Sequence, residues 1–203
     1  MKKLIALLAL LGTTSCQSLD LAVDTGDYYR ALEVHGAVGQ LEEANQYTDD
    51  DPVLAGGARI LVQPNNENLI DESSEPNRPL GLVGLFGVSF AKTGATAGGQ
   101  DLDINYGQLD MGLRYYFETW VPWFQPYIDT TFAMRRYITD VPGGDVYDTT
   151  KGFVGRLGVE FPLGARGRFG FGYQLSAQME TDEGGVENDL DDNLVYGTFT
   201  WVF

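Results

Sequence analysis

The sequence predicts an all-β protein, an eight-stranded antiparallel up-and-down transmembrane β-barrel. Three observations lead to this fold class. Eight segments of about ten residues alternate between two kinds of side chain, and that length suits a tilted strand crossing a bilayer. One face of each segment is bulky and aromatic, whereas the other is rich in Gly, Ala, Ser, Thr and isolated charges. Polar, acidic connections separate the segments, and longer ones mostly alternate with shorter ones.

Composition limits the classes of function. The chain has 203 residues, which suits one domain, and its 29 Asp and Glu outnumber 13 Lys and Arg to give a net charge of −16. That charge argues against a nucleic-acid partner, because a phosphate backbone needs clustered positive charge. A single Cys and a single His exclude a disulfide framework and Cys-rich metal centres, and we expect no cofactor.

Residues 1–15 are predicted to be a signal peptide. A basic start precedes an apolar run, Leu4–Leu11, which is too short to cross a bilayer as a helix. Small residues and then Cys16 follow, and this site resembles a bacterial lipobox, although Thr13 stands where that motif prefers Leu. We expect cleavage before Cys16 and its lipidation; the alternative is an ordinary cleavage site that happens to contain a Cys. Residues 27–203 then form the barrel.

Alternation defines the first four predicted strands, at residues 32–39, 54–63, 80–91 and 108–117. Their bulky faces carry Leu32 and Val34, then Ile60 and Val62, then Phe86 and Phe90, then Leu109, Met111 and Leu113. Their opposite faces carry Glu33 and His35, then Arg59, then Gly87 and Ser89, then Asp110 and Arg114. The fourth of these strands shows the clearest alternation.

The same alternation defines four more strands, at residues 128–135, 153–161, 169–176 and 195–203. Their bulky faces carry Ile128 and Phe132, then Phe153 and Leu157, then Phe169 and Phe171, then Val195, Phe199 and Trp201. Their opposite faces carry Asp129 and Arg135, then Arg156 and Glu160, then Gly170 and Gly172, then Thr198 and Thr200. Eight such strands are enough to close a small barrel.

The bulky face is predicted to point outward into lipid. Eight repeats of large apolar side chains exceed the room inside an eight-stranded barrel, whereas small and paired polar residues can fill a narrow lumen. The alternative is a lipidated, soluble, lipocalin-like ligand carrier with its apolar residues inside. Exposure of Phe86, Phe132, Phe171 and Phe199 would argue against that carrier.

The connections suggest an orientation. Long acidic connections are expected at residues 42–53, 92–103, 138–150 and 181–192, and short ones at 118–125 and 162–167, as in barrels with long external loops and short periplasmic turns. Residues 64–79 break the rule, so either that turn is an elaborated periplasmic segment or an early strand is misplaced. The runs Asp49–Asp51 and Glu187–Asp192 offer oxygen ligands for divalent cations, with solvated loops as the alternative.

Aromatic residues crowd around one short connection and are predicted to form an interfacial girdle: Tyr115, Tyr116, Phe117, Trp120, Trp123, Phe124 and Tyr127. The alternative is a core cluster in a soluble fold. Because aromatic rings with a polar group favour the headgroup level of a bilayer, the cluster supports a membrane barrel.

Two stretches resemble a known family. The closing residues Gly197, Phe199, Trp201 and Phe203 resemble the C-terminal signal read by the outer-membrane assembly machinery. The stretch 112–117, followed by a turn and Pro126-Tyr127-Ile128, is similar to the central hairpin of small OmpA-, OmpX- and OmpW-like barrels. This resemblance implies a bacterial outer-membrane location and a packed barrel. We expect the barrel to be monomeric, with outer-membrane lipids and the assembly machinery as partners.

Charged residues share the inward face and are predicted to form a lumenal ion-pair network: Glu33, His35, Arg59, Asp110, Arg114, Asp129, Arg135, Arg156 and Glu160. An unpaired buried charge costs several kcal/mol, so a water-poor lumen must pair these groups. An ion path or gate is the alternative to a structural plug, but we expect no large pore.

His35 raises the alternative of a lipid-A-modifying barrel enzyme. The deacylase type of such enzymes has a His-x-Ser motif on a strand. Here Gly36 and Ala37 follow His35, so the hydroxyl of that motif is missing. The palmitoyltransferase type pairs its His with an Asp-Ser motif near the outer surface. The nearest candidate here, Asp71–Ser73, would lie on the periplasmic side of the barrel, away from His35. We therefore expect a non-enzymatic outer-membrane barrel with a largely closed lumen and acidic external loops, serving envelope structure or surface interaction.

Overall fold

The computed structural model describes residues 29–41, 48–63, 81–97, 100–121, 123–141, 144–164, 166–179 and 191–203. The expected signal peptide, the lipidation site Cys16 and the segment 64–79 lie outside these residues. So do Asp71–Ser73 and most of the acidic run Glu187–Asp192.

The described chain forms β-strands joined by connections. The strands are β1 (Tyr29–Leu41), β2 (Thr48–Asp50), β3 (Val53–Gln63), β4 (Gly81–Ala97), β5 (Gln100–Tyr116), β6 (Gln125–Val141), β7 (Gly144–Leu163), β8 (Gly167–Met179) and β9 (Asp192–Val202). Among the described residues, no helix has the length and apolarity needed to cross a membrane.

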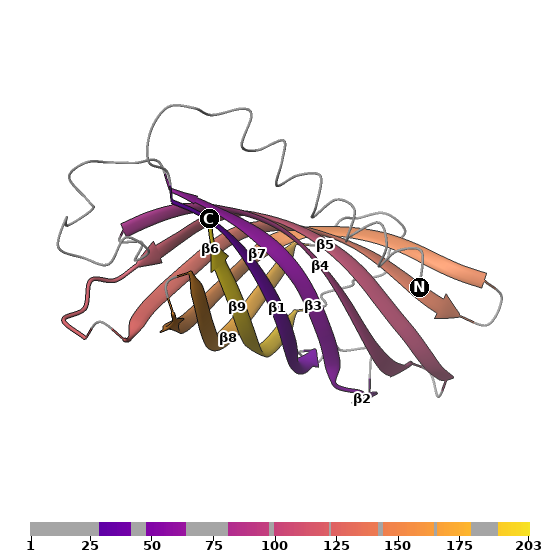
Figure 1. Cartoon of the computed structure of the whole chain (residues 1–203). Helices are drawn as coiled ribbons and strands as arrows, with labels where there is room; N and C mark the ends of the chain where they lie inside the picture. The colour runs from indigo at the N-terminus through magenta and orange to yellow at the C-terminus, as the bar shows by residue number, and fades with distance from the viewer. Residues whose placement is uncertain are drawn as a thin grey trace.

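Eight long strands close into a barrel. Every pairing is antiparallel, with the order β4-β3-β1-β9-β8-β7-β6-β5, and β4 pairs with β5 to complete the ring. The short strand β2 adds to the side of β4. Figure 1 shows the long strands tilted around a common axis. The predicted eight-stranded antiparallel barrel is confirmed, and β2 is a short addition that the alternation did not reveal.

The bulky face of the barrel points outward. Phe86, Phe132, Phe171 and Phe199 are 52%, 44%, 50% and 42% exposed, respectively. Their neighbours along each strand are buried or half-buried inside, since successive side chains of a strand point to opposite faces. A lipocalin-like carrier would keep such aromatic side chains dry in its interior. The structure therefore contradicts the carrier alternative.

Two of the expected long loops are strand instead. β4 and β5 stay paired up to Ala97 and Gln100, and β6 and β7 up to Val141 and Gly144. The expectations for 92–103 and 138–150 were therefore wrong. Alternation continues through these segments, but many of their outward residues, such as Asp103, are polar because they lie beyond the apolar belt. Polarity on that face marks the edge of the belt, not the end of a strand.

The extra length makes the barrel asymmetric. β4, β5 and β6 have 17 residues each and β7 has 20. β1 and β8 have 13 each, and β3 and β9 have 11. We call the end that holds the start of β1 and the end of β9 the terminal end, and the other the loop end. The β4–β5 and β6–β7 hairpins project at the loop end.

The aromatic cluster divides between the two faces. Tyr116 and Tyr127 are fully buried in the lumen, so the expectation that they belong to the outer girdle was wrong. Outside, Trp123 stacks on Phe161 with ring centroids 6.3 Å apart, and Phe161 stacks on Phe171 at 5.7 Å. These three rings follow the outer surface near the terminal end. The girdle therefore extends over β7 and β8.

We expect Leu113→Arg to lower the free energy of unfolding by about 2–4 kcal/mol, because this outward side chain lies within the apolar belt. Asn105→Arg, on the same face of β5 beyond the belt, is the matched control and should have little effect. Denaturant titration in lipid vesicles measures both. If Leu113→Arg and Asn105→Arg lower the free energy of unfolding equally, the assignment of Leu113 to the lipid-facing outer surface is wrong.

Candidate functional site

The candidate site is the charged lumen. Eight of the nine predicted lumenal residues are buried there, all with side chains at most 2% exposed. They are Glu33, Arg59, Asp110, Arg114, Asp129, Arg135, Arg156 and Glu160. His35 also faces inward and is half-buried. The structure adds two charged residues that the sequence analysis missed, Arg168 and Asp192.

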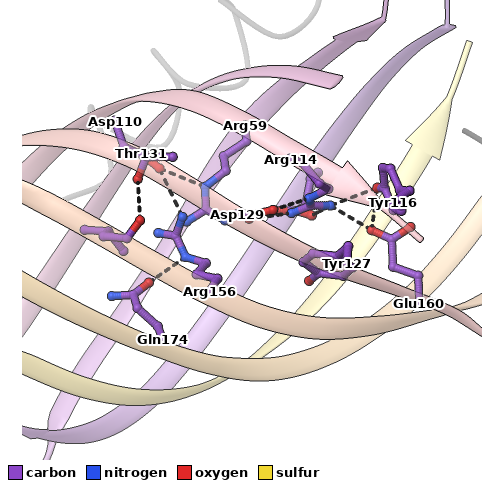
Figure 2. A network of polar contacts seen from close by, with 12 residues as sticks. Arg59, Asp110, Arg114, Tyr116, Tyr127, Asp129, Thr131, Arg156, Glu160 and Gln174 are labelled. Atoms are coloured by element: carbon purple, nitrogen blue, oxygen red, sulfur yellow. Dashed lines mark hydrogen bonds and ion pairs between the residues drawn. The ribbon is translucent and has the colours of Figure 1, made fainter. Parts of the chain in front are cut away.

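Arg59 and Arg156 hold the middle of the network (Figure 2). The Nη1 atom of Arg59 donates to Glu33 at 3.1 Å, and its Nε atom donates to Asp110 at 3.1 Å. Arg156 lies 3.4 Å from the same Asp110 carboxylate and donates to Gln174 at 2.7 Å. Asp110 thus joins two arginines from different strands.

Arg114 is the most heavily shared cation. Its Nε and Nη2 atoms donate to both oxygens of Asp129, at 2.7 and 3.0 Å. Its Nη1 atom lies 2.8 Å from both Glu33 and Glu160. The Tyr127 ring covers the guanidinium at 3.9 Å, as Figure 2 shows. An arginine suits this position because its fixed fork of donors serves several acceptors at once.

The network continues toward the loop end. Arg135 pairs with Asp192 at 2.7 Å and donates to Gln108 at 2.7 Å. Gln174 donates to Asp192 at 3.0 Å, which joins this pair to the central arginines. Tyr106 donates to the other Asp192 oxygen at 2.8 Å. The two residues on which the loop-end part depends, Arg135 and Asp192, are fully buried.

The terminal end has a second carboxylate junction. Glu160 accepts from Tyr116 at 3.0 Å in addition to its bond with Arg114. Arg168 lies 3.5 Å from Glu160 and donates to Gln125. A continuous chain of polar contacts therefore runs from Asp192 near the loop end to Arg168 near the terminal end.

Two of these residues were missed for identifiable reasons. Arg168 has the inward parity of Gly170, but the strand was expected to begin one residue later. Asp192 was counted with the acidic loop as a cation ligand, yet it is the first residue of β9 and faces inward. Its pairing with Arg135 corrects that part of the expected cation-binding run.

The buried charges balance. Within the described residues, five arginines and five carboxylates are buried: Arg59, Arg114, Arg135, Arg156, Arg168, Glu33, Asp110, Asp129, Glu160 and Asp192. The lumen is thus neutral although the whole chain carries −16. Neutrality matters because a surplus charge in a medium of low dielectric constant would cost several kcal/mol.

Two clusters of buried apolar and aromatic residues pack alongside this network. Toward the loop end lie Val53, Ala91, Ile104, Tyr106, Tyr137 and Leu194. Toward the terminal end lie Ala31, Leu61, Val83, Tyr116, Tyr127, Tyr196 and Val202. The buried charged residues are themselves at most 5% exposed, so their charges are shielded from water.

Inward glycines make room for the large polar side chains. A Cβ on Gly87 would lie 2.5 Å from Cγ of Arg59 and 2.9 Å from the Asp110 carboxylate. A Cβ on Gly158 would lie 2.6 Å from both the Tyr127 ring and the Tyr196 hydroxyl. The small residues of the inward face are therefore the space that the arginines and tyrosines occupy.

The described neighbours of His35 do not orient it as a catalytic base would be oriented. It is directly paired with Gly57 on β3 and Thr198 on β9. Its Nδ1 atom is buried without a hydrogen-bond partner in the described part of the chain. A catalytic base is normally oriented by such a partner. No group of three or more His, Cys, Asp and Glu among the described residues could hold a metal ion.

The predicted assembly residues lie on one face. Phe199, Trp201 and Phe203 are 42%, 43% and 58% exposed, and Gly197 shares their outward parity on β9. These side chains present an aromatic row beside β1 at the terminal end, where the chain closes the barrel.

Comparison with known proteins defines the class of fold. No protein-family model and no curated protein matches the sequence. Among solved structures, Neisserial surface protein A is similar with a TM-score of 0.60 and 14% identity, over 87% of this chain and 97% of that one. Ail of Yersinia pestis is similar with a TM-score of 0.55 and 10% identity, over 88% of this chain and 100% of that one. The N-terminal β-barrel domain of Pseudomonas aeruginosa OprF is similar with a TM-score of 0.50 and 10% identity, over 87% of this chain and 100% of that one.

These likenesses establish the fold as that of small, eight-stranded bacterial outer-membrane β-barrels. The outward apolar belt agrees with the same location, since only a closed barrel lets strands cross lipid with every backbone group paired.

We expect Arg114→Leu to lower the free energy of unfolding by about 3–5 kcal/mol, because Asp129, Glu33 and Glu160 would be left buried with too little positive charge. Lys92→Leu is the control, since Lys92 makes only an exposed pair with Asp103. Urea titration followed by tryptophan fluorescence compares the variants. An Arg114→Leu barrel as stable as Lys92→Leu would refute a structural role for the network.

Gly87→Ala is expected to lower the free energy of unfolding by about 1–3 kcal/mol, because the new methyl group would press on Arg59 and Asp110. Gly36→Ala is a matched control on β1, where an added Cβ meets nothing within 4 Å. The same urea titration applies. If both substitutions have the same effect, the lumen is less tightly filled than the contacts indicate.

Proposed function

We propose that this chain is a non-enzymatic bacterial outer-membrane barrel with a closed lumen, serving envelope structure or surface interaction through its outer surface and loop end. The observation that carries this proposal is the filled lumen, in which ten balanced charges of the described residues and two clusters of apolar and aromatic side chains are buried. Side chains occupy the space through which a solute would pass.

The surroundings of His35 support the non-enzymatic part of the proposal. Its ring faces the lumen, and its Nδ1 atom has no orienting partner among the described residues. This side chain lies behind the strand wall, among buried lumenal side chains such as Glu33 and Arg59. The geometry therefore gives no support to lipid-A chemistry at His35.

The exterior supports a role at the cell surface. The β4–β5 and β6–β7 hairpins carry exposed acidic residues beyond the apolar belt, including Asp101, Asp103, Asp140 and Asp145. Such carboxylates would favour contacts with divalent cations or basic partners. The outward Phe199, Trp201 and Phe203 agree with a signal for the assembly machinery. Signal-peptide cleavage and lipidation at Cys16 remain predictions.

In planar lipid bilayers, the purified chain is expected to give no sustained conductance, since the network and the clusters fill its lumen. A 16-stranded porin measured in the same bilayers is the positive control. On gels, the unheated barrel should migrate faster than the boiled chain, which shows that the inserted protein is folded. A steady conductance from folded protein would contradict the closed lumen.

The non-enzymatic part has its own test in the same cells. Lipid A extracted with and without the protein should have the same mass spectrum. A modification that appears with the wild-type protein and disappears with His35→Ala would overturn this part of the proposal, while leaving the barrel itself intact.

A further inference from the structure

The exposed cations of the barrel lie at the borders of its apolar belt. Among the described residues, the exposed Lys and Arg side chains are Lys92, Arg136, Lys151 and Arg166. Arg166 lies at the terminal end, in the connection between β7 and β8. The other three lie on β4, β6 and β7, where the outward residues change from apolar to polar toward the loop end.

Strand register brings two of these cations together. Arg136 on β6 is paired with Thr149 on β7, and Lys151 on β7 is paired with Met134 on β6. Arg136 and Lys151 are therefore diagonal neighbours on the outer face of adjacent strands. Such neighbours lie about 7–8 Å apart, within reach of one ligand for side chains of this length.

Both cations keep their charge available. Lys92 is paired with Asp103 at 3.4 Å, but within the described part of the chain neither Arg136 nor Lys151 has a carboxylate at ion-pair distance. The guanidinium of Arg136 lies over the Tyr147 ring, 5.5 Å from its centroid. A contact with the ring face restrains the guanidinium and leaves its N–H groups free for oxygen acceptors.

An apolar surface lies directly below these cations. Lys151 is followed on the same face by Phe153, which meets Phe132 edge-on with centroids 5.9 Å apart. Phe132, Phe153 and Met134 are 44%, 47% and 40% exposed. Asp140 and Asp145 lie on the far side of the cations, away from the belt. From the belt toward the loop end, the surface thus presents apolar side chains and then the two cations. Ile138 and Tyr147 come next, and the carboxylates follow.

This order matches an anionic amphiphile. We propose that Arg136 and Lys151, with Tyr147 restraining the arginine, bind the phosphate group of a phosphorylated membrane lipid whose acyl chains pack on Phe132 and Phe153. The occupant is a lipid and not free phosphate, because the cations directly border the apolar surface. The inference rests on the membrane location of the proposed function and assigns that barrel a lipid site.

The test measures lipid binding to the purified full barrel in detergent by native mass spectrometry. The probes are bisphosphorylated lipid A, the same lipid A after dephosphorylation, and inorganic phosphate. The double variant R136Q/K151Q is compared with wild type, and K92Q and R166Q are the controls. We expect the double variant to bind phosphorylated lipid A about tenfold more weakly, as loss of a charge-assisted contact implies.

The outcomes separate the alternatives. Unchanged affinity in K92Q and R166Q, with dephosphorylated lipid A bound weakly by every form, supports the site. The proposal is overturned if R136Q/K151Q retains wild-type affinity, if K92Q or R166Q loses as much, or if wild type binds both forms of lipid A equally. Competition by millimolar inorganic phosphate would show a free-anion site instead.

The failure of the proposed function would look different. If wild-type protein does not show faster gel migration before heating, the membrane barrel itself is wrong, and this site falls with it. If the migration shift is present in every variant, a loss of lipid affinity in R136Q/K151Q alone reports on the site and not on folding.

Discussion

The lumen has room for side chains but not for water that could solvate their charges. The arginines and carboxylates inside it must therefore neutralise one another. That constraint explains why Arg114 is shared by three carboxylates and why Asp110 joins Arg59 to Arg156. It also explains the glycines at inward positions such as Gly87, because the Arg59 side chain occupies the space beside its paired neighbour on the adjacent strand. The position of one charge therefore restricts the choice of residues on several strands.

The outer surface obeys a different rule. Lipid accepts any large apolar side chain, so the identity of the outward residues within the apolar belt is weakly constrained. The belt is marked by its lack of charged side chains, and among the described residues exposed charges begin at its borders. β4 to β7 continue past that border while the other long strands end near it. The barrel therefore has one side that projects at the loop end. Among the described residues, the buried charges of the lumen sum to zero, and exposed carboxylates such as Asp103 and Asp140 lie on the outer surface.

Alternation along the strands was enough to predict the fold, the outward face and most of the lumenal residues. Each strand has a period of two, so a single residue such as Arg59 or Phe86 fixes the direction of its neighbours. Strand ends could not be predicted in the same way. Polar residues such as Asp103 were taken as loop, although alternation persisted there, and Asp192 was assigned to a loop although it begins β9. Which lumenal residues contact one another depends on the register between neighbouring strands, and a single sequence does not specify that register.

The contacts of the lumen join residues that lie far apart in the chain. Tyr106 and Asp192 are separated by 86 positions, and Tyr127 and Tyr196 by 69. Both of the later residues belong to β9, the last strand of the chain. Without β9, Arg135 would lack its carboxylate, and the side of the barrel between β8 and β1 would stay open. The strand that completes the ring thus also supplies the carboxylate that balances Arg135, so a barrel without β9 would differ from the complete one in its electrostatics as well as its shape.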